Sequence, residues 1–408
     1  MNRNGFDMDT LASAGALLQS AVDNGDLSGV VAMVWRDGEV RVDTVGQRDI
    51  ARGLPMRRDT LFRIASMTKP ITSVAAMMLV EEGKVALADP ITTWLPEFAN
   101  MRVLKRPDGP LDDTVERARA IAVEDLLTHR SGLAYGFTST GALAKAHEEA
   151  LGSPLDPPYT PDEWLKRLAG LPLTYPPGQQ LHYSHATDVL GFLVGRAAGM
   201  DFRDFVLQRI FKPLGMNDTD FHIPPSKRDR AAVMYQRDAA TGKLHPYAMP
   251  QYDDPPAFAG GGGGLISTLD DYLAFARMML NDGALDGRRY LKPETVALMR
   301  ANHLTEAQRQ IPFLGLPFWM SMGFGLGVSV VMDAAKQEWM GAGSKGSFGW
   351  PGAFGTWWQA DPVTGTILIF LIQDYVPLAA DVAGRAVTGA RMACPMWQKA
   401  VYAALKGP

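Results

Sequence analysis

Apolar and polar positions near the start of the chain predict a helix followed by a hairpin. In residues 8–24 the apolar side chains recur with the spacing of one helix face. Residues 30–35 form an apolar run typical of a buried strand. Asp37 and Gly38 then favour a tight turn, and 40–43 alternates between apolar and polar residues. We therefore expect the order helix, strand, strand.

The middle of the chain has a helical pattern interrupted by loops. The pattern changes from about Ser66, and residues 71–83 are typical of a mostly buried helix that Gly83 is suited to cap. Further helices are expected from residue 123 and across 188–199, 202–211 and 269–280. Loops rich in proline and glycine separate them, including 151–161 and the five glycines at 260–264.

The end of the chain returns to strand patterns. Residues 323–331 and 354–360 are typical of strands, and 366–372 is the clearest one. A closing helix is expected at 396–405, after Pro395.

The expected fold class is α/β plus all-α. Both chain ends, 1–65 and 310–408, should form a split α/β part. A mainly helical part with long loops, 66–309, should be inserted between them.

Composition and charge exclude several classes of protein. With 47% hydrophobic and 21% charged residues, the chain is not broadly disordered. A net charge of −4 argues against a dedicated nucleic-acid binder. The single cysteine, Cys394, can form neither an internal disulfide nor a cysteine-based zinc cluster. We see no secretory signal and no stretch of about 20 apolar residues, so we expect a cytoplasmic protein without a membrane partner. A chain that had lost its signal would look the same.

Most standard catalytic motifs are missing from the sequence. It has no H-E-x-x-H, no Walker loop and no G-x-S-x-G. The glycines at 260–264 lack a phosphate-binding lysine, and we interpret them as a flexible loop or close backbone packing. His182 and His185 approach metal-ligand spacing, but no complete set of Asp, Glu or Cys ligands accompanies them. We therefore expect neither a metal nor another cofactor.

One remaining motif, Ser66-Met67-Thr68-Lys69, can support nucleophilic catalysis. Residues three apart on a helix share a face, so the lysine amine would lie beside the serine hydroxyl. Serine needs a base, and lysine can serve when burial or a nearby cation keeps its amine neutral. The positive end of the helix would favour an oxyanion at Ser66. The alternative is a helix-capping serine with an exposed lysine.

Two other segments carry groups that fit this chemistry. Tyr183 follows a proline-glycine turn, and a phenol can act as acid or base when lysines lower its pKa. Trp350 lies among glycines at or beside a predicted strand, where a backbone can approach a substrate closely.

The chain resembles the penicillin-binding-protein-like serine hydrolases, in the branch that holds class C β-lactamases and family VIII carboxylesterases. The motifs that carry this resemblance are L-F-R-I-A-S-M-T-K at 61–69, L-L-T-H-R-S-G-L at 126–133, Y-S-H at 183–185, P-L-G-M at 213–216, G-G-L-I-S-T at 263–268 and W-P-G at 350–352. The resemblance implies a class C β-lactamase-like fold, an antiparallel sheet flanked by helices. It also implies an inserted helical domain, with the active site at the interface.

The resemblance also implies roles for individual residues. Ser66 would be the acylated nucleophile. Lys69 would accept its proton, directly or through Tyr183. Tyr183 would protonate the leaving group and later activate water. The backbone N–H groups of Ser66 and Ala353 would form the oxyanion hole, and Gly352 would contact the substrate.

Two positions depart from the family pattern. Trp350 replaces the lysine of the K-T-G motif, so the site should favour uncharged acyl or alcohol groups, unless Trp350 is only a core aromatic. His185 replaces an asparagine and would orient Tyr183 or contact a substrate carbonyl, unless it is a surface histidine. Tyr135, in the segment 134–160, should contribute to the pocket wall.

The expected activity is that of a serine carboxylesterase acting on small, short-acyl esters through an acyl-enzyme on Ser66. A β-lactamase, a D-amino-acid peptidase or amidase, and an acyltransferase of the same superfamily are the alternatives. A catalytically idle binding module is a fourth. The expected partner is a small-molecule ester, and the oligomeric state stays open.

Overall fold

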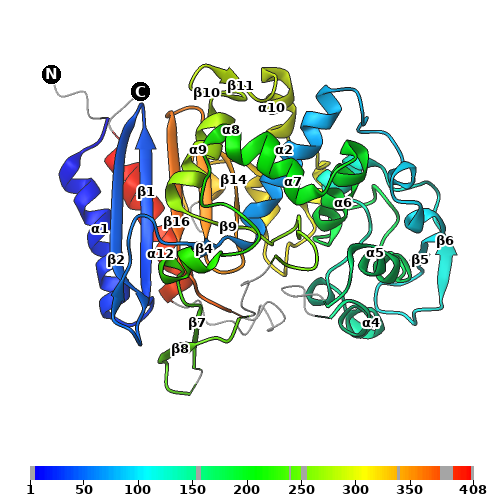
Figure 1. Ribbon diagram of the computed structural model, residues 1–408, viewed down its shortest axis with the longest axis horizontal. Coiled ribbons are helices and arrows are strands. Elements are labelled where there is room, and N and C mark those ends of the chain that lie inside the picture. The colour runs from blue at the N-terminus through cyan, green and yellow to red at the C-terminus, as the bar shows by residue number, and fades with distance from the viewer. Residues whose placement is uncertain are drawn as a thin grey trace.

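The computed structural model describes residues 5–152, 158–238, 240–249, 255–337, 341–376 and 389–405 (Figure 1). Its helices are α1 Met8–Asp23, α2 Thr68–Glu81, α3 Val123–Leu127, α4 Gly141–Leu151, α5 Pro161–Ala169, α6 Ala186–Ala198, α7 Phe202–Val206, α8 Lys212–Leu214, α9 Leu269–Leu280, α10 Pro293–Met299, α11 Glu306–Arg309 and α12 Gly389–Ala404. Its strands are β1 Gly29–Arg36, β2 Glu39–Asp49, β3 Leu54–Pro55, β4 Phe62–Arg63, β5 Arg102–Leu104, β6 Thr114–Glu116, β7 Tyr235–Arg237, β8 Leu244–Pro246, β9 Ile266–Ser267, β10 Ala284–Leu285, β11 Arg288–Arg289, β12 Met322–Phe324, β13 Ser329–Val331, β14 Phe348–Pro351, β15 Trp357–Asp361 and β16 Thr366–Leu371.

An antiparallel sheet joins the two ends of the chain. Its strand order is β12-β13-β14-β15-β16-β1-β2-β3. β1 pairs with β16 from Val31 opposite Leu371 to Arg36 opposite Thr366, and with β2 on its other side. The predicted antiparallel sheet flanked by helices is therefore confirmed.

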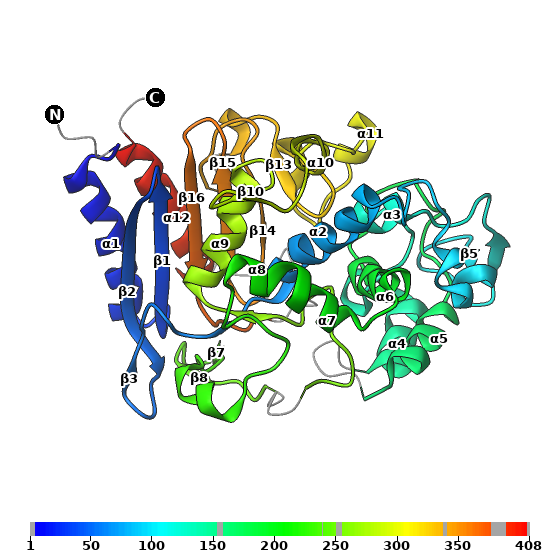
Figure 2. The same ribbon diagram turned by 45° about the horizontal axis from the view of Figure 1, so that its top comes forward.

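Alternate side chains of β1 face two different layers, which explains its unbroken apolar run. Val30, Ala32 and Val34 pack with residues of α1 and α12 on one face. Val31 and Met33 belong to the main core on the other face, where α9 packs against β1, β15 and β16. A strand covered on both faces needs no polar alternation. Figures 1 and 2 show α1 and α12 side by side outside the sheet and the remaining helices beyond the other face.

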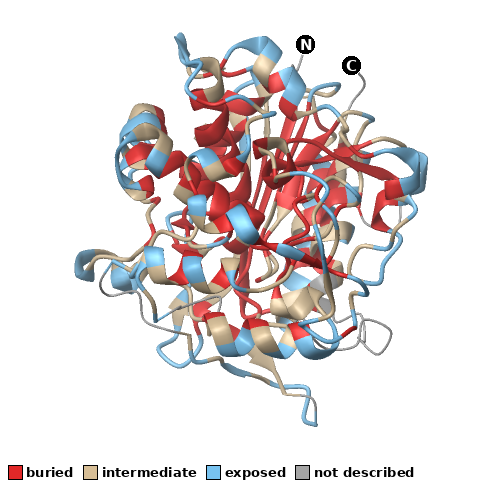
Figure 3. Ribbon diagram, turned by 90° about the vertical axis from the view of Figure 1, so that its right-hand side faces the viewer, coloured by how far each residue is buried: buried red, intermediate tan, exposed pale blue. Residues whose placement is uncertain are grey.

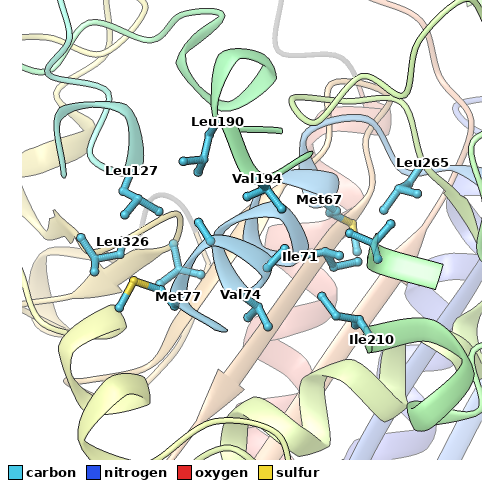
Figure 4. Packing of buried hydrophobic residues seen from close by; sticks show 14 of the residues in the cluster. Met67, Ile71, Val74, Met77, Leu127, Leu190, Val194, Ile210, Leu265 and Leu326 are labelled. Carbon is cyan, nitrogen blue, oxygen red and sulfur yellow. The ribbon is translucent and has the colours of Figure 1, made fainter. Parts of the chain in front are cut away.

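Helix α2 lies at the centre of the main core, and all of its residues from Thr68 to Leu79 are buried. Figure 4 shows Ile71 and Val74 of α2 among side chains from neighbouring elements, with Leu190 and Val194 of α6 close by. Burial-coloured ribbons show the same concentration of buried residues around the sheet and the central helix (Figure 3). A helix buried all round holds its first turn in a fixed position.

Three expected elements at the end of the chain differ from the structure. The single strand expected at 323–331 is a hairpin of β12 and β13, because Gly327 has φ +88° and allows a tight turn. The strand expected at 354–360 begins only at β15, because Gly355, with φ +84°, lies in a turn. The closing helix begins at Gly389 rather than after Pro395. Burial of α12 against α1 and the sheet offsets the hydrogen bond that Pro395 removes.

Other predicted elements agree with the structure within a few residues. The helix expected at 202–211 continues from α7 as a π-helical turn, Leu207–Phe211. The expected loop at 151–161 lies partly outside the described residues. Helix α9 packs on the sheet, although the predicted boundary assigns it to the inserted helical part. The division into two domains stays a prediction. Among the described residues no helix is long and apolar enough to span a bilayer.

Candidate active site

Ser66 lies on a tight turn directly before α2. The turn, Ala65–Met67, has 3-10 geometry, and Ala65 adopts φ +45°, a left-handed conformation that costs a non-glycine residue free energy. The Thr356 hydroxyl donates a 3.2 Å hydrogen bond to the Ile64 carbonyl oxygen and holds the turn on the β14–β15 connection. The strained turn therefore places the Ser66 hydroxyl at the N-terminal end of α2, as the sequence predicted.

The Lys69 side chain is almost fully buried, with 1% of its surface exposed. Its Nζ donates to Ser66 Oγ at 3.1 Å, to Tyr135 Oη at 3.3 Å and to the Gly262 carbonyl oxygen at 2.5 Å. Three protein oxygens therefore lie within hydrogen-bond distance of the Lys69 nitrogen. The alternative of an exposed lysine beside a capping serine is therefore excluded.

Tyr183 reaches Ser66 from the segment before α6. Its hydroxyl donates a 2.7 Å hydrogen bond to Ser66 Oγ, and Lys69 Nζ lies 4.7 Å from the centre of its ring. Trp350 on β14 donates from Nε1 to Tyr183 Oη at 3.3 Å. The structure thus brings Lys69 and Tyr183, two of the predicted catalytic residues, into contact with the hydroxyl oxygen of the third, Ser66.

Buried aromatic residues surround Tyr183 and Trp350 and form what we call the aromatic cluster. Trp350 is 2% exposed and packs against phenylalanine rings from three other positions. The members of the cluster are Tyr135, Leu181, Tyr183, Leu304, Phe318, Trp319, Met322, Phe324, Val331 and Trp350. Trp350 is therefore a core aromatic whose N–H points at the tyrosine hydroxyl, and its predicted contact with substrate stays a prediction.

The backbone at Gly352 and Ala353 lies beside the Ser66 turn. A Cβ atom at Gly352 would overlap the Ile64 carbonyl oxygen, so only glycine allows this close approach. Ala65 and Ala353 belong to one apolar cluster. This proximity is compatible with an oxyanion hole formed by the N–H groups of Ser66 and Ala353, which stays a prediction, as does substrate contact by Gly352.

His185 is buried at the start of α6 and is not a surface histidine. It is 5% exposed, and its Nδ1 lies 2.9 Å from Asp188 Oδ2. Its ring packs edge-on against the rings of Tyr135 and Trp164. The described contacts of His185 are therefore with protein groups, and its predicted contact with a substrate carbonyl stays a prediction.

Tyr135 was expected only in the pocket wall, but its hydroxyl also accepts a hydrogen bond from Lys69. Burial, followed by the charge of Asp188, raises the pKa of the Tyr135 phenol well above 10, so the phenol stays protonated. Behind Tyr183, burial lowers the pKa of His129 well below 6.5, and the Lys69 charge acts in the same direction. His129 is therefore a neutral packing partner of the Tyr183 ring.

Sequence reasoning assigned no role to Asp188, although it lies three residues after His185. The structure places its carboxylate between His185 Nδ1 and the backbone N–H of Gly262. The i, i+3 spacing of the two residues at the start of α6 was the available signal. Among the described residues, no group of three His, Cys, Asp or Glu side chains is arranged to hold a metal ion.

Comparison with known proteins agrees with this geometry. A family model described as Beta-lactamase matches residues 15–390. This chain belongs to the beta-lactamase family. Esterase EstB of Burkholderia gladioli is 33% identical over 395 residues, which cover 90% of this chain and 92% of EstB. Protein Rv1367c of Mycobacterium tuberculosis is 48% identical over 398 residues, which cover 96% of this chain and 98% of Rv1367c.

A solved structure extends the agreement to the fold. EstCE1, described as a hydrolase with promiscuous acyltransferase activity, has a TM-score of 0.78 and 27% identity. The match covers 94% of this chain and 98% of EstCE1. The family resemblance and the class C β-lactamase-like fold are thus confirmed, and this member of the beta-lactamase family is a serine hydrolase.

Proposed function

We propose that this protein is a serine carboxylesterase that hydrolyses small, short-acyl esters through an acyl-enzyme on Ser66. The observation that carries the proposal is that Ser66 Oγ lies within hydrogen-bond distance of both Tyr183 Oη, at 2.7 Å, and Lys69 Nζ, at 3.1 Å. A serine hydroxyl with a phenol and an amine in contact has a direct route for its proton when it attacks a carbonyl. Similarity to EstB supports ester chemistry.

The proposed reaction has two steps. Ser66 Oγ attacks the ester carbonyl while its proton passes to the Tyr183–Lys69 pair, and Tyr183 returns a proton to the leaving alcohol. Water, deprotonated through Tyr183, then attacks the acyl-enzyme and releases the acid. The N–H groups of Ser66 and Ala353 would stabilise the oxyanion in both steps, and losing one such donor typically costs about 3 kcal/mol of barrier.

Trp350 supports the preference for neutral esters over β-lactams and peptides. The resemblance places it where β-lactamases carry a lysine, and the structure gives this position a buried indole bonded to Tyr183. An indole carries no charge to bind a substrate carboxylate. We therefore expect p-nitrophenyl butyrate to be hydrolysed faster than a cephalosporin such as nitrocefin.

Acyl transfer is a second candidate, favoured by the description of EstCE1. Both reactions share the acyl-enzyme and differ in whether water or an alcohol accepts the acyl group. Product analysis with a competing alcohol distinguishes them: a new ester formed in preference to the acid would favour transfer.

The Ser66→Ala variant tests the proposed nucleophile. We expect the hydrolysis rate of p-nitrophenyl butyrate to fall at least about 1,000-fold, because the variant lacks the oxygen that would carry the acyl group. Ser73→Ala is the matched control, since Ser73 is buried on the same helix, and it should retain the activity of the unmodified protein. Full activity in the Ser66→Ala variant would refute the proposal.

A further inference from the structure

Lys69 is surrounded by three acceptors, and Asp188 binds the peptide that supplies one of them. The acceptors are Ser66 Oγ, Tyr135 Oη and the Gly262 carbonyl oxygen. The Gly262 N–H donates to Asp188 Oδ1 at 2.7 Å, and the charge of the same carboxylate helps to raise the pKa of the Tyr135 phenol. Asp188 therefore holds the Gly262 peptide, which supplies one of the two lysine acceptors that do not belong to the nucleophile.

The Asp188 side chain is only slightly exposed to solvent, and its other oxygen is also occupied. Its side chain is 12% exposed, and Oδ2 lies 2.9 Å from His185 Nδ1. Burial alone would raise the pKa of the carboxyl, but the bond to His185 and the charge of Lys69 outweigh it and lower the pKa. The group is thus an ionised acceptor at neutral pH.

The glycine run at 260–264 gives this carboxylate access to the backbone. A Cβ atom at Gly262 would lie 2.7 Å from both Asp188 oxygens, closer than van der Waals contact allows. Gly262 therefore uses both of its backbone groups at the site. Its N–H donates to the Asp188 carboxylate, and its carbonyl oxygen accepts from Lys69. Close backbone packing, one of the two interpretations of the run, is what the structure has at Gly262.

We propose that Asp188 is a positioning residue: it holds the Gly262 peptide, whose carbonyl oxygen binds Lys69, and so fixes the Lys69 amine beside Ser66. The proposal rests on the proposed function, because it concerns the same nucleophile. Asp188 acts on the reaction through Lys69 and touches neither Ser66 nor the predicted oxyanion donors in the described contacts. Removing its charge should therefore slow the chemical step and leave substrate binding nearly unchanged.

The Asp188→Asn variant tests this role. We expect kcat for p-nitrophenyl butyrate to fall about 10- to 100-fold, since a small misplacement of a catalytic group has effects of this size, while KM changes less than about threefold. The matched control is Asp361→Asn. Asp361 is likewise a buried carboxylate, bonded to backbone N–H groups and to the Tyr402 hydroxyl, but it lies at the β15–β16 turn. The control should lose stability without losing kcat per folded molecule.

A normal kcat in folded Asp188→Asn protein, or a loss confined to KM, would overturn the proposal. If Asp188→Asn does not fold, Gly262→Ala takes its place, because its Cβ would displace the peptide that links Lys69 to Asp188. A fall in kcat of about tenfold supports the proposal, and an unchanged kcat overturns it. Ser66→Ala, assayed in parallel, separates the two claims: if it is inactive while Asp188→Asn is fully active, only the positioning role fails.

Discussion

At the scale of single residues, the sequence predicted the catalytic residues that belong to a recognisable motif. The S-x-x-K spacing places Lys69 one helical turn from Ser66, and the family resemblance points to Tyr183. Asp188 was missed because its partners come from distant segments, which only the tertiary structure brings together. Tyr135 was assigned to the pocket wall for the same reason, since no pattern shows that its hydroxyl meets Lys69.

The indole N–H of Trp350 is open to a direct test. Trp350→Phe keeps an aromatic ring in the aromatic cluster but removes the 3.3 Å hydrogen bond to Tyr183 Oη. A neutral hydrogen bond contributes about 1 kcal/mol, so we expect kcat/KM for a short aryl ester to fall roughly fivefold. Trp319→Phe is the matched control, because Trp319 is equally buried in the same cluster and packs on phenylalanine rings. Equal losses in both variants would assign the effect to packing instead.

At the scale of elements, periodic segments were predictable and glycine-rich ones were not. Helices α1, α2 and α9 agree with their apolar spacing because each buries a defined set of side chains. The β12–β13 hairpin was predicted as one strand, since its turn depends on the positive φ of Gly327 rather than on hydrophobicity. A glycine run likewise carries no side-chain pattern from which its partners could be inferred.

Two glycines of the same run should respond differently to alanine. At Gly262 a Cβ atom would lie 2.7 Å from Asp188 Oδ1 and Oδ2, whereas at Gly260 the nearest atom is 3.7 Å away, an ordinary contact. We expect Gly262→Ala to lower kcat for a short aryl ester by about tenfold or more, because it displaces the carbonyl that binds Lys69. Gly260→Ala should stay within about twofold of the unmodified protein. Similar kcat values for the two variants would contradict this account of the loop.

At the scale of the whole molecule, the sheet explains why residues far apart in sequence meet at one site. The Ser66 turn follows β4, Trp350 lies on β14, and Tyr183 precedes α6. Antiparallel pairing of β1 with β16 brings the C-terminal strands next to the N-terminal ones. The sequence predicted that both ends share a sheet from their strand patterns, but strand order depends on long-range packing, which local patterns do not contain.

A charged cluster around Asp218 makes the stability of the molecule depend on pH. Arg230 and then Lys227 lower the pKa of Asp218 to about 2. Because the folded pKa lies below the unfolded one, the ionised carboxylate stabilises the fold at neutral pH, and this contribution disappears as the pH falls from about 4 to about 2. Asp218→Asn should therefore lower the free energy of unfolding by about 1 kcal/mol at pH 7, a figure discounted for solvent screening.

Urea unfolding at several pH values measures this difference. The gap between the unmodified protein and Asp218→Asn should close toward pH 2, while Asp112→Asn, at an exposed position, should differ little at any pH. A gap that stays constant with pH would show that Asp218 does not stabilise the fold through its charge.

The central claim is that Ser66 carries the acyl group during turnover. Mixing the protein briefly with p-nitrophenyl butyrate, quenching in acid and mapping peptides by mass spectrometry tests it most directly. The account predicts one butyryl group on the peptide that contains Ser66, decaying as substrate is consumed and missing in the Ser66→Ala variant. A butyryl group on a different residue, or turnover by Ser66→Ala at the rate of the unmodified protein, would contradict it.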